Sequence, residues 1–204
     1  MSAEIIPFNP LDKANLGSSV ADALLARQAV PLAELSEFRG AGVYALYYTG
    51  GFKPYRPLAK LNVGSAHRAP IYVGKAVPAG SRKGGVLEMK PGRALFNRLS
   101  EHAESIRAAT NLEIDDFACR FLVVDDIWIP LGESLLIARF APLWNSLIDG
   151  FGNHDPGSGR HAGMRPRWDV LHPGRVWAMK CKERKEKAAD IEREVLNFLA
   201  NAND

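Results

Sequence analysis

Arg98 and His102 stand four residues apart in the stretch "RALFNRLSEHAESIRAAT", residues 93–110. The apolar spacing of this stretch predicts a helix, so both side chains project from one face, one turn apart. A guanidinium can hold a phosphate through two parallel N–H groups, and a neighbouring imidazole can move a proton near neutral pH. The same spacing also fits an ordinary solvent-exposed pair, so the two residues alone leave both interpretations open.

Two tyrosines stand beside glycines in stretches that predict strands. Tyr44 ends "GVY" in "GVYALYYTGG", and Tyr72 begins "YVG" in "PIYVGKAVPAG". Taken singly, each is most simply an aromatic side chain of a sheet. The Gly74-Lys75 step is not a P-loop, because the spacing to the preceding glycine is wrong and no hydroxyl follows the lysine. Any phosphate at this segment is therefore bound in another way.

Glu133 follows Gly132 at the start of a predicted helix, "LGESLLIARFAPLW". One interpretation is an N-terminal acid that the helix dipole favours. The other is a ligand for a hard divalent cation, since Mg²⁺ commonly takes one or two carboxylates together with substrate phosphate and waters. The position in the sequence is compatible with both.

Composition narrows the class of protein. The 204 residues suit one domain with appended arms, and a hydrophobic content of 47% is enough for a core. No apolar run approaches the ~18 residues of a membrane span, and we expect no signal peptide from the N-terminal stretch. Cys119 and Cys181 are too few for a disulfide framework, so we expect a reducing, cytoplasmic setting.

Basic residues gather in two blocks, although the net charge is only +3. Residues 60–107 hold nine Lys/Arg against three Asp/Glu, and residues 151–187 hold nine against four. Solvated surfaces explain most such blocks, but a polyanionic partner would also require them.

The predicted elements follow the order helix, strand, strand, helix, strand, helix. We expect an α/β (α+β) fold with a three-stranded sheet flanked by helices. Residues 51–69 are predicted to be a long loop, and residues 149–176 an arm rather than a core element. The expected domains are a helical N-terminal extension (1–39), a core (40–148) and a C-terminal arm and helix (149–204).

The tripeptides "GVY" and "YVG" are followed along the chain by Arg98, His102, Glu133 and Asn145. This constellation resembles the GIY-YIG nuclease superfamily over roughly residues 40–148. The stretches "GAGVYALYYTG", "PIYVGKAVPAG", "APLWNSLIDGFGNH" and "WDVLHPGR" are similar to its small type II restriction endonucleases and extend the likeness to about residue 178. Valine replaces isoleucine in both tripeptides, and the gap between the two tyrosines is longer than usual in the family.

The resemblance implies metal-dependent hydrolysis of double-stranded DNA at a specific, palindromic site by a homodimer. It implies one divalent metal, Mg²⁺ or Mn²⁺, on Glu133 and charge neutralisation by Arg98. Tyr44 would act as base or relay, with His102 and Tyr72 in support, and neighbouring cations would lower the pKa of Tyr44. A neutral His102 could instead take the proton, directly or through Tyr44, and the sequence leaves both routes open. Asn145 would be an orienting amide or a structural residue. A cognate DNA methyltransferase is expected in the host, without direct contact. Candidates for DNA contacts are Lys75, Arg82, Lys83, Arg93, Arg160, Arg165 and Arg167.

Two alternatives to a restriction enzyme stay open. A repair or mobile-element nuclease of the same superfamily would share the motifs, but such enzymes often carry a separate DNA-binding domain. A non-catalytic DNA-binding protein on a nuclease scaffold would tolerate the loss of the motif residues, which are intact here. A tyrosine recombinase also uses Arg, His and Tyr, but its tyrosine comes last, and here both tyrosines precede Arg98.

Overall fold

The computed structural model describes residues 12–78, 92–155, 157 and 162–201. Within them, four antiparallel strands form one sheet in the order β1-β4-β2-β3. The strands are β1 (Val30–Pro31), β2 (Gly42–Tyr48), β3 (Tyr72–Ala76) and β4 (Phe117–Val123). The α/β (α+β) class and the three predicted strands are confirmed, and the two-residue β1 is a fourth strand that the sequence did not predict.

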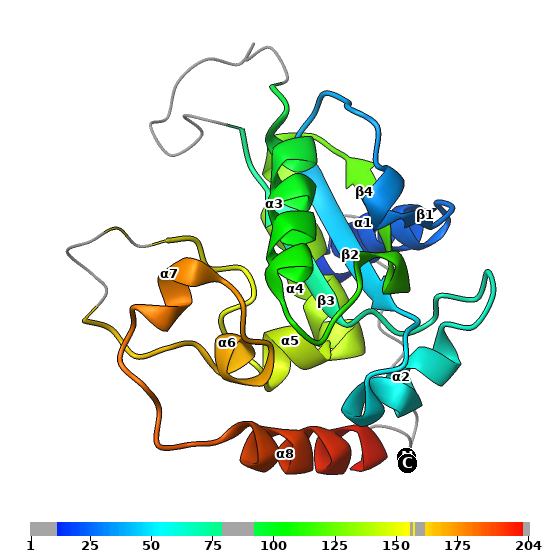
Figure 1. Ribbon diagram of the computed structural model, residues 1–204. Coiled ribbons are helices and arrows are strands. Elements are labelled where there is room, and N and C mark those ends of the chain that lie inside the picture. Colours follow the sequence, from blue (N-terminus) through cyan, green and yellow to red (C-terminus); the bar gives the residue numbers. More distant parts are fainter. Residues whose placement is uncertain (1–11, 79–91, 156, 158–161, 202–204) are drawn as a thin grey trace, which may run out of the picture.

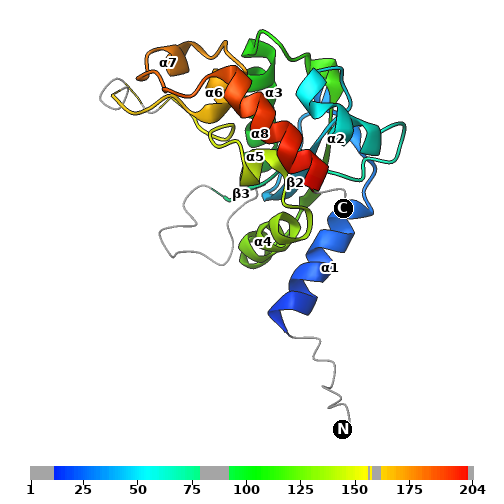
Figure 2. The same ribbon diagram turned by 90° about the horizontal axis from the view of Figure 1, so that it is seen from below.

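Helices cover both faces of the sheet (Figures 1 and 2). α3 (Ala94–Ala108) lies on one face, and α1 (Lys13–Leu25) lies with α4 (Ile129–Phe140) on the other. Because both faces are covered, all seven residues of β2 are buried. No helix in the described part of the chain is long and apolar enough to cross a membrane. The remaining helices are α2 (Arg56–Leu61), α5 (Leu143–Ser146), α6 (Arg167–Leu171), α7 (Val176–Met179) and α8 (Ala188–Asn201).

Side chains along β2 alternate between two cores, as the strand period requires. Tyr44 and Leu46 point into the larger core, to which α3 contributes Leu99. Val43 and Ala45 point into the smaller core, which α1 and α4 cover. β3 is the edge strand next to β2, so among the described residues no strand pairs with its outer side. Groups from both sheet faces can therefore meet around β3.

Residues 51–69 are not the long loop that the sequence predicts. A 3₁₀ turn at Lys53–Tyr55 leads into α2, and Tyr55 is completely buried. Pro57 lies in the first turn of α2, where its missing N–H removes no helical hydrogen bond. The Tyr55 hydroxyl lies 2.6 Å from Nε2 of His172, which ties this segment to the C-terminal part of the chain.

The prediction that residues 149–176 form an arm outside the core is wrong for their described part. Phe151, Trp168 and Leu171 are at most 2% exposed and belong to the larger core. α8 crosses the bottom of the molecule in Figure 1 and packs Ile191 onto the same core. Large aromatic side chains inside a Gly- and Pro-rich stretch explain this, because burying each removes much apolar area from water. The predicted domain boundaries themselves stay a prediction.

Candidate active site

Strand register brings the two motif tyrosines to one face of the sheet. Tyr44 on β2 lies opposite Gly74 on β3, and Tyr72 lies opposite Leu46, two residues further along β2. The two phenol rings are 6.2 Å apart between centroids. A Cβ atom at Gly74 would lie 2.4 Å from the Tyr44 hydroxyl oxygen, so only glycine leaves room for that ring. The close approach gives a physical reason for the glycine of "YVG".

α3 presents Arg98 and His102 to these rings, as the four-residue spacing predicts. The Tyr44 hydroxyl lies 2.6 Å from Nε2 of His102, and the Tyr72 ring meets the imidazole edge-to-face at 5.3 Å. Nη2 of Arg98 donates to the carbonyl oxygen of Gly152 at 2.7 Å. The opposite end of the guanidinium contacts Glu101 at 3.1 Å and also His154. One end of the Arg98 guanidinium is therefore anchored to the backbone, and the other end contacts two side chains that a ligand can replace.

Burial sets the protonation of the Tyr44–His102 pair. Burial lowers the pKa of His102 well below its ordinary value, and the positive charge of Arg98 lowers it further. Burial raises the pKa of Tyr44 well above its ordinary value and outweighs the opposite influence of Arg98. At neutral pH the imidazole is thus neutral and accepts a hydrogen bond from the phenol. The prediction that neighbouring cations lower the pKa of Tyr44 is wrong in net direction, because it neglected burial.

Lys75 and Glu133 meet on the other face of the sheet. Lys75 lies opposite Val43 in the register, and its Nζ is 2.6 Å from a carboxylate oxygen of Glu133. Burial raises the pKa of Tyr72, Arg98 opposes that rise, and Glu133 adds to it, so the carboxylate lies within electrostatic range of the phenol. On one side of the edge strand β3, its own Tyr72 lies beside Tyr44 from β2, and on the other side its Lys75 meets Glu133 from α4.

The structure does not support Glu133 as a helix N-terminal acid. α4 begins at Ile129, and its first turn contains no acidic residue. A Cβ atom at Gly132 would lie 2.6 Å from Val20, so this glycine allows α4 to lie close to α1. The side chain of the neighbouring Glu133 reaches Lys75 on β3 and is only 19% exposed. A dipole effect confined to the first turn would not reach this residue.

The donor set fits one divalent cation that the protein holds through a single carboxylate. Among the described residues, no three His, Cys, Asp or Glu side chains gather into a protein-only cage. Glu133 supplies a hard oxygen ligand, and the ammonium group of Lys75 already occupies a position for a positive charge beside this carboxylate. Mg²⁺ is commonly bound this way, with substrate phosphate and waters completing its ligands.

Asn145, just after the start of α5, binds the free edge of β3. Its side-chain oxygen accepts from the N–H of Val73 at 2.8 Å, and its amide nitrogen donates to the carbonyl of Val73 at 2.8 Å. Both amide groups are thus engaged with backbone between Tyr72 and Gly74. In the structure, Asn145 is positioned to hold the strand that carries Tyr72.

The predicted DNA-contact residues differ in their surroundings. Lys75 is 39% exposed beside Glu133, and Arg93 is 53% exposed beside Glu37. The other two described candidates are occupied internally: Arg165 donates to the carbonyl groups of Ala178 and Met179, and Arg167 binds Glu186, Glu194 and the carbonyl of Leu147. The remaining candidates, Arg82, Lys83 and Arg160, lie outside the described residues.

Sequence reasoning assigned no role to the turn at residues 150–153, which adjoins the site. The Phe151 ring stacks on His102 with centroids 4.5 Å apart and planes within 16°. Gly152 supplies the carbonyl that anchors Arg98. The stretch "GFGNH" was part of the resemblance to restriction enzymes, but nothing in its composition shows a contact with residues fifty positions earlier.

The structure thus brings together two tyrosines on paired strands, an Arg-x-x-x-His helix over them and a glutamate across the edge strand, which is the set of residues behind the resemblance to GIY-YIG nucleases. The chain belongs to the Eco29kI GIY-YIG family, whose model matches residues 36–199. It is a family of type II restriction endonucleases, so the protein is a nuclease with DNA as its substrate class, and nucleases of this kind generally use a divalent metal. A comparison with curated proteins found no match.

Proposed function

We propose that the protein is a sequence-specific type II restriction endonuclease that hydrolyses double-stranded DNA with one divalent metal, Mg²⁺ or Mn²⁺. The observation that carries this proposal is the 2.6 Å hydrogen bond between Tyr44 and His102, beside Arg98 and across β3 from Glu133. Phosphodiester hydrolysis needs an aligned water, a cation on the phosphoryl oxygens and help for the leaving oxygen. Each of these three tasks has a suitable side chain here.

Water activation falls to the Tyr44–His102 pair. The attacking water gives a proton to the Tyr44 oxygen while Tyr44 gives its own proton to Nε2 of His102. The water oxygen bonds to phosphorus, the bond from phosphorus to the 3′ oxygen breaks, and that oxygen takes a proton from solvent. A neutral imidazole is suited to accept the proton. This relay avoids a free phenolate, which burial disfavours, and places the charge on His102, where the bound phosphate would stabilise the buried imidazolium.

Arg98 binds a non-bridging oxygen of the scissile phosphate. Its bond to Gly152 fixes one side of the guanidinium, whereas Glu101 and His154 hold the opposite end in the free protein. We infer that phosphate displaces these two side chains, because a bidentate pair of hydrogen bonds between arginine and phosphate is stronger than an exposed ion pair. Tyr44 is 0% exposed in the free protein, so the relay also requires that water reach its hydroxyl when DNA binds.

Glu133 would hold the metal on the leaving-group side. A divalent cation there neutralises the charge that develops on the leaving 3′ oxygen. Lys75 now pairs with this carboxylate, and binding of the cation would release its ammonium group to contact DNA phosphate. Asn145 keeps β3, and with it Tyr72 and Lys75, in register with the rest of the site.

Cleavage of both strands requires two such sites, since each holds one scissile phosphate. A twofold homodimer on a palindromic sequence is the simplest arrangement. We expect sedimentation to show a dimer at least on cognate DNA, and a monomer both free and bound would contradict this part of the proposal. Action in the reducing cytoplasm fits the two free, buried cysteines, and the host would need a cognate DNA methyltransferase to protect its own sites.

Incubation of the purified protein with plasmid DNA and Mg²⁺ or Mn²⁺ tests the proposed function. Discrete fragments support a sequence-specific nuclease, and a smear would mean a non-specific one. A mobility shift without cutting would favour a non-catalytic binding protein. The chelated reaction without added metal is the control, because the proposal expects no cleavage there.

A further inference from the structure

The turn at residues 150–153 touches three catalytic candidates: Arg98 and His102 on α3, and Tyr72 on β3. Phe151 stacks on His102 and meets the Tyr72 ring edge-to-face at 5.0 Å. The carbonyl of Gly152 accepts the 2.7 Å hydrogen bond from Arg98. Any displacement of this turn would therefore move a phosphate-binding guanidinium and the surroundings of the proton acceptor together.

There is little space between the turn and the site. A Cβ atom at Gly152 would lie 2.8 Å from the Tyr72 hydroxyl and 3.1 Å from Nη2 of Arg98. Contacts below about 3.4 Å would force one of these side chains to move. The position of the turn is therefore matched to the site within a fraction of an ångström.

Arg175 fixes the backbone of this turn from behind. Its Nη1 donates to the carbonyl oxygens of Phe151 and Asn153 at 3.0 and 3.1 Å, and its Nη2 donates to that of Gly150 at 2.9 Å. Asp169 accepts from Nε at 2.7 Å and from Nη2 at 2.6 Å. The N–H groups of one planar guanidinium thus bind three carbonyl groups of the turn and a carboxylate.

Arg175 is itself held rigidly. Its guanidinium lies between the rings of Trp168, at 4.5 Å, and Trp177, at 4.8 Å. Arg175 and Asp169 are only 5% and 3% exposed. Within the described part of the chain, neither residue hydrogen-bonds to the phenols, the imidazole or Glu133. The charge of Arg175 helps to lower the pKa of His102, and the contacts of the pair with the site pass through the turn.

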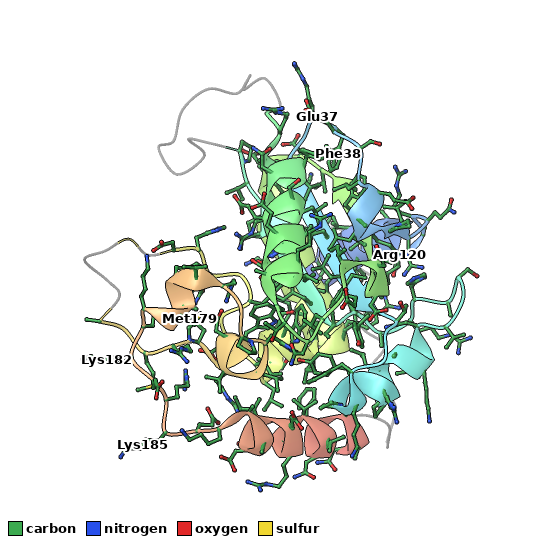
Figure 3. The ribbon with its side chains drawn as sticks, in the orientation of Figure 1. Glu37, Phe38, Arg120, Met179, Lys182 and Lys185 are labelled. Carbon is green, nitrogen blue, oxygen red and sulfur yellow. The ribbon has the colours of Figure 1, made fainter. Side chains whose placement is uncertain are left out.

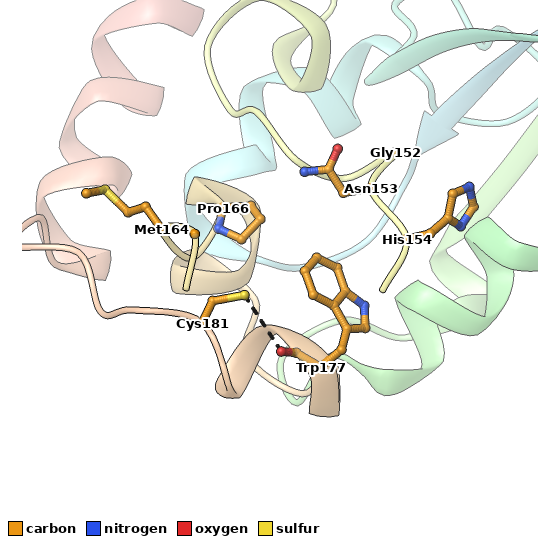
Figure 4. A pocket seen from close by; sticks show the side chains of 8 residues that line it. Gly152, Asn153, His154, Met164, Pro166, Trp177 and Cys181 are labelled. Carbon is orange, nitrogen blue, oxygen red and sulfur yellow. Dashed lines mark hydrogen bonds between the residues drawn. The ribbon is translucent and has the colours of Figure 1, made fainter. Parts of the chain in front are cut away.

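Asn153 and His154 line a pocket of about 410 Å³ together with Trp177 (Figure 4). Arg175 holds the three carbonyl groups of the turn, and packing against Trp144 and Trp168 holds the Phe151 ring. A buried ion pair is by itself weak evidence for a contribution to stability. Positioning of the turn is therefore the more specific role for the Arg175–Asp169 pair.

We propose that Arg175, oriented by Asp169, is a positioning residue for DNA hydrolysis: it holds the 150–153 turn so that Gly152 aims Arg98 and Phe151 packs His102. This inference rests on the proposed function and adds a residue that acts through the turn. Lysine cannot replace it, because an ammonium group lacks the flat fork that reaches three carbonyl groups and a carboxylate at once.

The test compares Arg175→Lys with Arg120→Lys. Arg120 is also buried, at 9% exposure, and donates to the carbonyl groups of Arg27 and His67 and to the Tyr47 hydroxyl. Figure 3 places Arg120 and Met179, at the end of α7, on opposite sides of α3. Both substitutions remove a buried guanidinium that binds carbonyl groups, but only one of them acts on the turn.

Three quantities are measured for each variant: melting temperature, DNA affinity, and single-turnover cleavage rate at saturating protein and a temperature where both variants are folded. Both variants lose stability. Arg175→Lys is expected to lose about 100-fold in cleavage rate with affinity within about threefold of wild type, as for a displacement of about 1 Å in a catalytic group. Arg120→Lys is expected to stay within about threefold in both. A folded Arg175→Lys protein that cleaves as fast as Arg120→Lys would overturn the proposal.

Gly152→Ala keeps the proposal testable if Arg175→Lys does not fold. Its control is Gly51→Ala, since a Cβ atom at Gly51 meets nothing within 4 Å. We expect Gly152→Ala to cleave at least about tenfold more slowly than Gly51→Ala at equal DNA affinity. Equal rates for the two alanine variants would overturn the proposal. A wild-type protein that does not cleave DNA at all would instead refute the proposed function, which keeps the two failures distinct.

Discussion

The hydroxyl of Tyr44 lies 2.6 Å from Nε2 of His102, and the two residues are 0% and 1% exposed. Burial lowers the pKa of His102 and raises the pKa of Tyr44, so neutral imidazole and neutral phenol are the stable forms. The proton of the phenol already points at its acceptor. The pair can therefore pass a proton from a water to the imidazole without a phenolate intermediate, and the phosphate of bound DNA would stabilise the imidazolium that results.

Removal of the Tyr44 hydroxyl separates chemistry from folding. We expect Tyr44→Phe to lose about 10²- to 10⁴-fold in single-turnover cleavage, the usual contribution of a positioned proton acceptor. Stability should fall by about 1–3 kcal/mol, because His102 loses its buried partner. The matched control is Tyr47→Phe, which removes a buried hydroxyl bonded to Arg120 on the other face of the sheet. Equal cleavage by the two variants would refute the relay.

Arg98→Lys keeps the charge and removes the fork. The Gly152 carbonyl and a phosphate oxygen cannot both be held by one ammonium group in the same geometry. Loss of one charged hydrogen bond, about 1.5–3 kcal/mol, corresponds to roughly 10- to 100-fold in cleavage rate. Arg107→Lys, an exposed change on the same helix, should leave the rate unchanged. Rates that fall equally in both variants would point to α3 stability as the cause.

The buried His172 makes stability depend on pH. Burial lowers its pKa to about 3, whereas an unfolded histidine titrates near its usual value of about 6.5. Below about pH 6.5 the unfolded chain binds a proton that the folded protein excludes, so stability is lost as pH falls toward the folded pKa. His172→Gln should reduce the slope of unfolding free energy against pH, between about pH 5 and 6, by up to about 1.4 kcal/mol per unit. Urea titrations that give one slope for both proteins would contradict this account.

Much of the site follows from short-range patterns. Alternation and glycine placement predicted the strands that carry Tyr44 and Tyr72, and 3.6-residue periodicity predicted the helix that aligns Arg98 with His102. Antiparallel pairing of adjacent strands then brings the tyrosines together. Such features depend on residues close in sequence or in neighbouring strands, and these are the features that a single sequence encodes most directly.

Long-range burial was not predictable in the same way. Arg175 stands in a Gly-, Pro- and Arg-rich stretch typical of a surface arm, yet it is enclosed between two tryptophans. Tyr55 lies in a segment predicted as loop and is fully buried. The direction of the Tyr44 pKa shift was missed for the same reason, since charged neighbours are visible in a sequence whereas desolvation requires the packed structure.

Glu133→Gln gives the most direct test of the central claim, that this site hydrolyses DNA with one metal on a single carboxylate. The change keeps the shape of the side chain and removes its charge. We expect the cleavage rate to fall by at least about 10³-fold, roughly 4 kcal/mol, while DNA affinity is retained or improves because a negative charge has left a site facing phosphate. Glu104→Gln, on the exposed side of α3, is the control and should cut like wild type. A Glu133→Gln protein that cuts within about tenfold of wild type would contradict the metal assignment and the mechanism built on it.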